Sequence, residues 1–144
     1  MDIIEATVGY IPSIIKSQKK AYQKVRDFNP SAIVDTSVDL ERRINANDWK
    51  VFIGVNENDE VMAGISYLIN STKDAVYGCR FFSVGNNGEG FELLEDISIR
   101  MSSNGIQTVY ARVFEGDSLL SKYQQKGFKI ASIAEIDECR ALIG

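Results

Sequence analysis

A glycine-rich turn carries the clearest sign of chemistry in this chain. Gly85, Gly88 and Gly90 lie between an apolar run, residues 76–84, and an amphipathic stretch that extends to about residue 103. This order is typical of a strand, a tight turn and a helix. Glycine lets the backbone turn sharply, and the first N–H groups of a helix have no partners within it. Because such N–H groups bind phosphate well, the stretch predicts a cradle for a diphosphate.

The spacing of these glycines disfavours two nucleotide-binding motifs. They follow G-x-x-G-x-G, whereas the dinucleotide fingerprint needs G-x-G-x-x-G. Gly85 and Gly90 have P-loop spacing, but Phe91 and Glu92 stand where that motif needs Lys and Ser or Thr. A nucleotide triphosphatase is therefore disfavoured, since the lysine that holds the phosphates is missing. A plain tight turn stays open as the alternative to a phosphate cradle.

The absence of histidine narrows the chemistry further. The 144 residues contain no His, which removes Ser-His-Asp and Cys-His catalysis and the usual zinc sites. Two cysteines, Cys79 and Cys139, with scattered carboxylates make a poor transition-metal site, so no metal is expected. Any acid–base step must use Glu, Asp, Lys, Tyr, Cys or water.

Charge and composition restrict the partners and the cellular location to be expected. The net charge of -4 and the pI of about 4.9 argue against nucleic-acid binding and favour cationic partners. The start of the chain lacks a signal-peptide pattern, and no apolar run approaches membrane-spanning length. We therefore expect a cytoplasmic protein without a membrane partner, and one domain over residues 1–144.

The periodicity of the apolar residues predicts an α/β (α+β) fold. Two stretches have helical spacing early in the chain, one from about Pro12 and one after Thr36, and a third covers 90–103. Expected strands cover 2–7, 49–55, 61–69, 76–84, 106–113, 128–136 and 139–143, with a short helix at 119–126. Strands 76–84 and 106–113 should be parallel, or splay at one end, because a helix connects them. A mixed sheet of six or seven strands with helices on both faces follows.

Three different local motifs follow one another along the chain. The first is Trp49–Val55 followed by Val61-Met62-Ala63-Gly64, the second is Gly88-Glu89-Gly90, and the third is Tyr123-Gln124-Gln125-Lys126-Gly127-Phe128. Together with the order of elements they resemble the GNAT superfamily of N-acetyltransferases. Each motif alone is weak, but their order and spacing are fairly specific.

The resemblance implies acetyl-CoA as a co-substrate. The pyrophosphate would bind backbone amides of residues 85–91, and the pantetheine arm would run beside residues 82–84. A backbone N–H near Ser83 could polarise the thioester carbonyl. Tyr123 stands where the family often keeps the proton donor for the thiol, which makes it the implied catalytic residue. The implied cofactor-binding residues are Phe82, Ser83, Val84, Gly85, Asn86, Asn87, Gly88, Glu89, Gly90 and Phe91.

The chain also departs from the family pattern. Gly85 stands at the Arg/Gln position, Gly116 stands where Asn is frequent, and strand 76–84 carries no Glu or Asp to serve as a base. Two functions stay open. One is acetyl transfer to a primary amine of a small molecule or peptide; the other is a degenerate member that binds CoA or a protein partner without catalysis. A homodimer also stays open, because exposed C-terminal strands could pair with those of a second copy.

Several side chains have both a structural and a functional interpretation. Aromatic residues of the sheet can line an acceptor pocket, although the sheet core is their commoner place; they are Tyr67, Tyr77, Phe81 and Phe82. Carboxylates near the early helices can attract a cationic amine, although solvated capping is the default; they are Asp35, Asp39 and Glu41. Trp49 is interpreted as structural, and Cys79 as a small buried residue.

Overall fold

The computed structural model describes residues 1–23, 34–85 and 89–112. The described elements are β1 (Asp2–Glu5), the 3₁₀ turn η1 (Val8–Tyr10), α1 (Ile11–Tyr22), α3 (Ser37–Asn45), β2 (Trp49–Val55), β3 (Val61–Ile69), β4 (Ala75–Ser83), α4 (Glu89–Ser103) and β5 (Thr108–Arg112). The helix expected at 119–126 and the two strands expected after it lie outside these residues.

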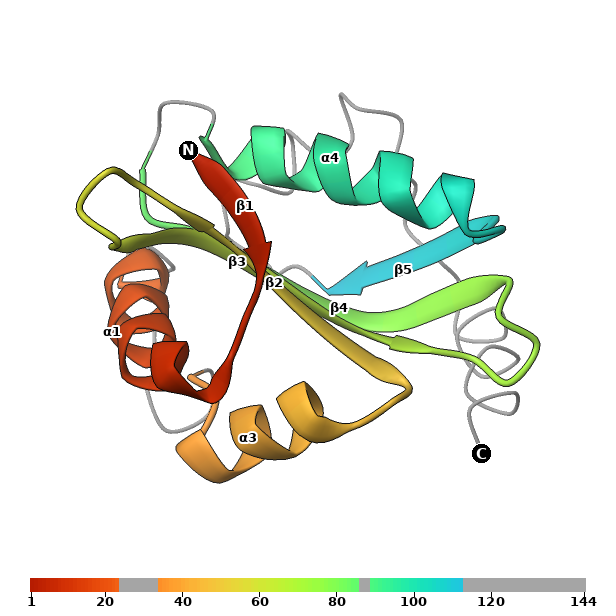
Figure 1. Cartoon of the computed structure of the whole chain (residues 1–144), viewed down its shortest axis with the longest axis horizontal. Helices are drawn as coiled ribbons and strands as arrows, with labels where there is room; N and C mark the ends of the chain where they lie inside the picture. The colour runs from red at the N-terminus through yellow and green to blue at the C-terminus, as the bar shows by residue number, and fades with distance from the viewer. Residues whose placement is uncertain (24–33, 86–88, 113–144) are drawn as a thin grey trace.

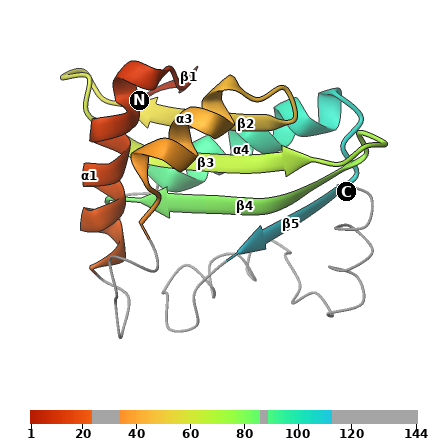
Figure 2. The same cartoon turned by 90° about the horizontal axis from the view of Figure 1, so that it is seen from below.

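The described strands form one mixed sheet in the order β1-β2-β3-β4-β5. Neighbouring strands are antiparallel except β4 and β5, which are parallel. Figure 2 shows β2 to β5 lying side by side. The mixed α+β fold and the parallel pair are thus as the sequence predicts, because the connection between β4 and β5 contains the helix α4.

Helices cover both faces of the sheet, as expected. In Figure 1, α4 lies along one face, and α1 and α3 lie on the other. Two clusters of buried side chains match these layers. One joins α1 and α3 to the sheet around Ile14, Leu40 and Ile53, and the other joins α4 to the sheet around Leu93 and Ile97. Side chains alternate along β2: Val51 and Ile53 pack in the core under α1 and α3, and Phe52 between them packs in the core under α4.

Helix α1 begins at Ile11, with Pro12 in its first turn, where a missing N–H costs nothing. Its buried stripe contains Ile14 and also the polar residues Ser17 and Gln18. The Ser17 hydroxyl donates to the Val61 carbonyl at 2.7 Å, which ties the helix to β3. Polar groups therefore share the stripe that packs on the sheet.

Helix α3 has the predicted capping at its start. The Asp39 amide donates to the Thr36 hydroxyl oxygen at 3.1 Å, so Thr36 satisfies one of the free donors of the first turn. Leu40 is 1% exposed and anchors the helix to the sheet. A four-residue spacing brings Ile44 to the same side, where it is partly buried.

Helix α4 buries the predicted stripe of Leu93, Ile97 and Met101. It ends at Ser103, and Gly105, two residues beyond, has a left-handed φ of 86°. The Ile106 amide donates to the Met101 carbonyl at 3.0 Å, and the Gly105 amide donates to Ser102 at 3.1 Å. This pair of bonds is the Schellman cap, and it confirms Asn104-Gly105 as the end of the helix.

Candidate functional site

Strand β4 extends beyond the last described residue of its parallel neighbour, β5. Among the described residues, the pairing between β4 and β5 runs from Ala75↔Thr108 to Arg80↔Arg112. The last residues of β4, Phe82 and Ser83, pair with β3, and the β4–β5 register of the described residues stops before them. The end of β4 thus lies beyond the last described pair with β5, in the stretch expected to run beside a pantetheine arm.

Strand β4 also carries one extra residue relative to both neighbours. Between Tyr77 and Arg80 its register shifts against β3, and between Val76 and Cys79 it shifts against β5. Such a bulge reverses the alternation of side chains beyond it. Val76 packs on the α4 face, yet Phe82, six residues later, packs on the α1–α3 face. The bulge therefore decides which aromatic side chain faces which helix at the end of β4.

Helix α4 approaches the end of β4 closely. A Cβ on Gly90 would lie 2.6 Å from Ser83 Cβ and 2.7 Å from Phe81 Cζ, closer than such atoms pack. Glycine at this position lets the first turn of α4 lie directly against Ser83. The Ser83 hydroxyl donates to the Gly85 carbonyl at 3.2 Å, which holds the strand end as it turns. The N-terminus of a 15-residue helix thus lies beside the end of β4.

The predicted cofactor-binding residues fall into three groups. Phe82, Ser83, Val84, Gly85 and Gly90 are described in full, and they bring the end of β4 and the first turn of α4 together. The backbones of Glu89 and Phe91 lie in α4. Residues 86–88, which are Asn86, Asn87 and Gly88, and the predicted catalytic residue Tyr123 lie outside the described residues. Their roles stay predictions.

The aromatic residues of the sheet divide between the two cores. Tyr67 and Phe81 are buried against α4, which confirms the sheet core as their place. Tyr77 is half-buried. Phe82 is buried in the opposite core, and it also lines a pocket. Of these four residues, Phe82 is thus the one that belongs to the sheet core and also lines a pocket.

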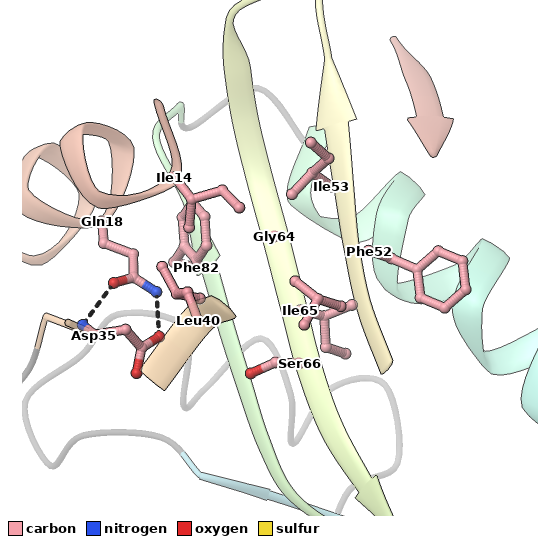
Figure 3. Close-up of a pocket in the computed structure, with 11 residues that line it drawn as sticks. Ile14, Gln18, Asp35, Leu40, Phe52, Ile53, Gly64, Ile65, Ser66 and Phe82 are labelled. Atoms are coloured by element: carbon pink, nitrogen blue, oxygen red, sulfur yellow. Dashed lines mark hydrogen bonds between the residues drawn. The ribbon is translucent and has the colours of Figure 1, made fainter. Parts of the chain in front are cut away.

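A pocket lies between the helices α1 and α3 and the sheet (Figure 3). It is a small hollow: the volume that the centre of a water molecule can reach is about 10 Å³. Apolar side chains form most of the wall, among them Ile14, Leu40 and Phe82. Polar side chains are contributed by Gln18 and by Ser66 of β3, together with Asp35. We call this space the α1–α3 pocket.

Asp35 is the buried charge of the α1–α3 pocket. It is 5% exposed, and its carboxylate accepts from Gln18 Nε2 at 2.7 Å and from Arg43 at 3.0 Å. Its own amide donates to Gln18 Oε1 at 2.9 Å, and Figure 3 shows both bonds to Gln18. The expectation of a solvated cap is therefore wrong for Asp35, because Arg43 and Gln18 satisfy the carboxylate away from water. Sequence spacing carried one signal of this, a polar Gln18 on the apolar stripe of α1.

The other polar candidates behave as expected. Asp39 is exposed, and a side-chain hydrogen bond with Thr36, followed by one from Arg42, holds its pKa below the usual value. Glu41 is exposed as well. The Arg43 guanidinium lies 4.8 Å from the centre of the Trp49 ring, a cation–π contact that gives Trp49 a structural role.

Two kinds of site are missing from the residues that the structure describes. None of their His, Cys, Asp and Glu side chains gather in a group that could hold a metal ion. No helix among them is long and apolar enough to cross a membrane.

Comparison with known proteins rests on structure alone. No family model matches the sequence, and no curated protein matches it. Solved structures match over most of the chain. An acetyltransferase of the GNAT family from Staphylococcus aureus Mu50 has a TM-score of 0.76 at 15% identity, over 96% of this chain and 90% of its own. The Escherichia coli ribosomal-protein-S18-alanine N-acetyltransferase has a TM-score of 0.71 at 14% identity, over 91% and 79%.

One solved structure with a similar fold is described as a regulator and not as an acetyltransferase. A transcriptional regulator from Bacillus halodurans C-125 has a TM-score of 0.70 at 13% identity, over 91% of this chain and 94% of its own. At these identities the likeness concerns the fold. The mixed sheet, the helices on both faces and the helix α4 beside the end of β4 agree with it. This chain has the fold of the GNAT acetyltransferases.

Proposed function

We propose that this protein is an acetyl-CoA-dependent N-acetyltransferase that acts on a primary amine of a small molecule or peptide. The observation that carries the proposal is the close approach of the α4 N-terminus to the end of β4, made possible by Gly90. In a fold shared with acetyltransferases, this is where the sequence places the glycine-rich turn. The S18-alanine enzyme among the similar structures acts on an amine of a protein, which supports this class of acceptor.

The described residues fit acetyl-CoA through their backbones. The first N–H groups of α4 have no partners within the helix, so they could bind a diphosphate. Glu92, in the first turns of α4, is exposed, so it need not face the bound anion. Ser83 and Gly85 would hold the start of the turn. When bound, acetyl-CoA supplies an acetyl thioester, and a backbone N–H near Ser83 would polarise its carbonyl.

The acceptor must arrive, or become, a neutral amine. Its nitrogen lone pair forms a bond to the acetyl carbon, the carbon–sulfur bond breaks with its electrons on sulfur, and one amine proton is finally carried by the thiol. Tyr123 is the proposed donor of the proton that the thiolate takes. Because strand 76–84 contains no carboxylate, an ordered water, Tyr77 or Cys79 would take the proton from the amine.

Thermal unfolding with acetyl-CoA tests the binding step. At about one hundred times the dissociation constant, specific binding stabilises a protein by roughly 2.7 kcal/mol, which raises Tm by several degrees in a domain of this size. We expect this shift for the natural chain and its loss in Gly88→Leu. Gly9→Leu is the matched control, because among the described residues the one atom within 4 Å of a Cβ at Gly9 is Thr7 Oγ1, at 4.0 Å. No shift in the natural chain would overturn the proposal.

A second candidate is a non-catalytic member of the fold that binds CoA or a protein partner. The missing carboxylate on β4 and the similar structure described as a transcriptional regulator favour it. Release of free thiol from acetyl-CoA in the presence of primary amines separates the two functions. Stabilisation by acetyl-CoA without amine-dependent thiol release would establish the second candidate.

A further inference from the structure

The C-terminal end of α4 carries an Asn-Gly pair, Asn104-Gly105, and both residues are exposed. Asparagine before glycine is chemically labile, because the glycine nitrogen can attack the side-chain amide carbon of the asparagine without hindrance from a side chain of its own. No atom of the described residues lies within 4 Å of where a Cβ on Gly105 would stand, so packing leaves room for a ring to form there. The end of α4 is therefore a candidate site of deamidation.

In the folded chain, hydrogen bonds engage both groups that would react. The Gly105 amide donates to the Ser102 carbonyl at 3.1 Å, and Asn104 Nδ2 donates to the Arg100 carbonyl at 2.9 Å. Attack requires the Gly105 nitrogen to lose its proton and the Asn104 side chain to turn toward it, so both bonds must break first. The Schellman cap thus holds the pair in an unreactive arrangement, and reaction requires this end of the helix to open.

The product of deamidation does not rebuild the cap. A carboxylate at position 104 has no donor for the Arg100 carbonyl, and it places a negative charge at the C-terminus of a helix, where the dipole disfavours it. Arg100 stands one turn earlier, but its Nε already lies 2.8 Å from the Asp96 carboxylate and its guanidinium lies 5.3 Å from the centre of the Phe52 ring. The new charge therefore has no compensating partner in Arg100.

We propose that Asn104 is a deamidation site, that opening of the α4 C-terminal cap controls its rate, and that conversion weakens this end of the helix. The Gly105 nitrogen forms a bond to the Asn104 side-chain carbon, the bond from that carbon to Nδ2 breaks, and ammonia leaves with the proton of the Gly105 amide. Water then opens the cyclic imide at one of its two carbonyls and yields aspartate or isoaspartate. The reaction needs water alone, so the inference is independent of acetyl transfer.

Peptide mapping by mass spectrometry tests the site and its control by the cap. The natural chain is incubated at mildly alkaline pH, folded in buffer and unfolded in guanidinium chloride, and the conversion of Asn104 is followed. In the unfolded chain, Asn104 should convert as fast as Asn87, which also precedes a glycine, Gly88. In the folded chain, Asn104 should convert at least about tenfold more slowly, as for a cap that is open less than about a tenth of the time. Equal rates in the two conditions overturn the role of the cap, and no conversion in the unfolded chain overturns the site.

A matched pair of variants changes the opening of the cap and leaves the reacting residues in place. Ser103 is the last residue of α4, and glycine disfavours a helix relative to alanine. We expect Ser103→Gly to convert several-fold faster than Ser103→Ala when folded, and the two to convert at the same rate when unfolded. The same rate in both folded variants would overturn the dependence on opening.

Two substitutions at position 104 test the consequence for the helix. Asn104→Asp reproduces the aspartate product, and Asn104→Ala removes the same side-chain hydrogen bond without adding a charge. We expect the Tm of Asn104→Asp to lie about 1–4 °C below that of Asn104→Ala, the size expected for an unfavourable charge at a helix end. High salt should reduce this difference by screening the charge. Equal Tm values, or a difference that salt does not change, overturn the proposed weakening by charge.

Discussion

At the scale of single residues, Gly90 has a packing role that binding motifs do not reveal. A Cβ there would meet both Ser83 and Phe81 within 2.7 Å. We expect Gly90→Ala to lower the free energy of unfolding by about 1–3 kcal/mol, as overpacking of a core usually does. Denaturant unfolding measures this change. Gly9→Ala serves as the comparison and should stay within about 0.5 kcal/mol, since the space around Gly9 is open. Equal effects at the two positions would contradict the close packing of α4 on β4.

Arg43 and Arg42 are adjacent on α3 but lie in different environments. Arg43 is 12% exposed and pairs with the buried Asp35, whereas Arg42 is 60% exposed and pairs with Asp39 at 3.4 Å. Removing one partner of a buried pair leaves the other charge uncompensated. We therefore expect Arg43→Met to destabilise the protein by about 3–5 kcal/mol.

The same substitution at Arg42 provides the control. An exposed pair contributes about 0–1 kcal/mol, so Arg42→Met should change stability by no more than that. Urea titrations of both variants give the comparison. A loss at Arg43 as small as the loss at Arg42 would show that Asp35 does not depend on its partner.

At the scale of elements, the end of α4 depends on one backbone conformation. Gly105 has a φ of 86°, and no atom of the described residues lies within 4 Å of where its Cβ would stand. The cost of a side chain there is therefore one of backbone strain alone. Gly105→Ala should destabilise the protein by about 1 kcal/mol, and Gly105→Asn should cost less, because Asn tolerates this region. Thermal unfolding of the two variants orders them, and the reverse order would argue against the left-handed cap.

The turn between β3 and β4 predicts an acid-side loss of stability. Side-chain hydrogen bonds from Thr72 and then Asn70 hold the pKa of Asp74 below its usual value. Since the folded pKa is lower than the unfolded one, the contribution is complete above the unfolded pKa and is lost as the pH falls through the folded pKa. Asp74→Asn keeps the shape without the titration. Stability measured from neutral pH down to about pH 3 should therefore fall less steeply in the variant.

At the scale of the whole molecule, one sheet is shared by both cores. Val51 and Ile53 face one core while Phe52, between them, faces the other. Because neither core persists without β2, we expect the chain to unfold as one cooperative unit. Trp49 is the single tryptophan, and its fluorescence reports on the packing of α3, because Arg43 of α3 lies over its ring. Its fluorescence and far-ultraviolet circular dichroism should give the same denaturation midpoint. Separate midpoints would show that the two layers unfold independently.

Much of the architecture follows from the sequence because it depends on local periodicity. The bounds of β2 and β3 agree with those expected from their apolar runs and turn residues. The stripe of α4 and its end just before Gly105 depend on spacing and on one glycine, and both were predictable. The parallel pair β4–β5 follows from the helix that connects them. These features are decided by residues close together along the chain.

The tertiary structure alone decided the features that join distant residues. The bulge in β4 reverses the faces of Phe81 and Phe82, and period-two alternation does not contain that reversal. Asp35 is buried because Gln18 of α1 and Arg43 of α3 reach its carboxylate, a pairing over 17 and 8 residues. The pocket above Ser66 depends on helices and strands separated along the sequence. Such contacts depend on how elements pack, whereas the sequence by itself determines which elements form.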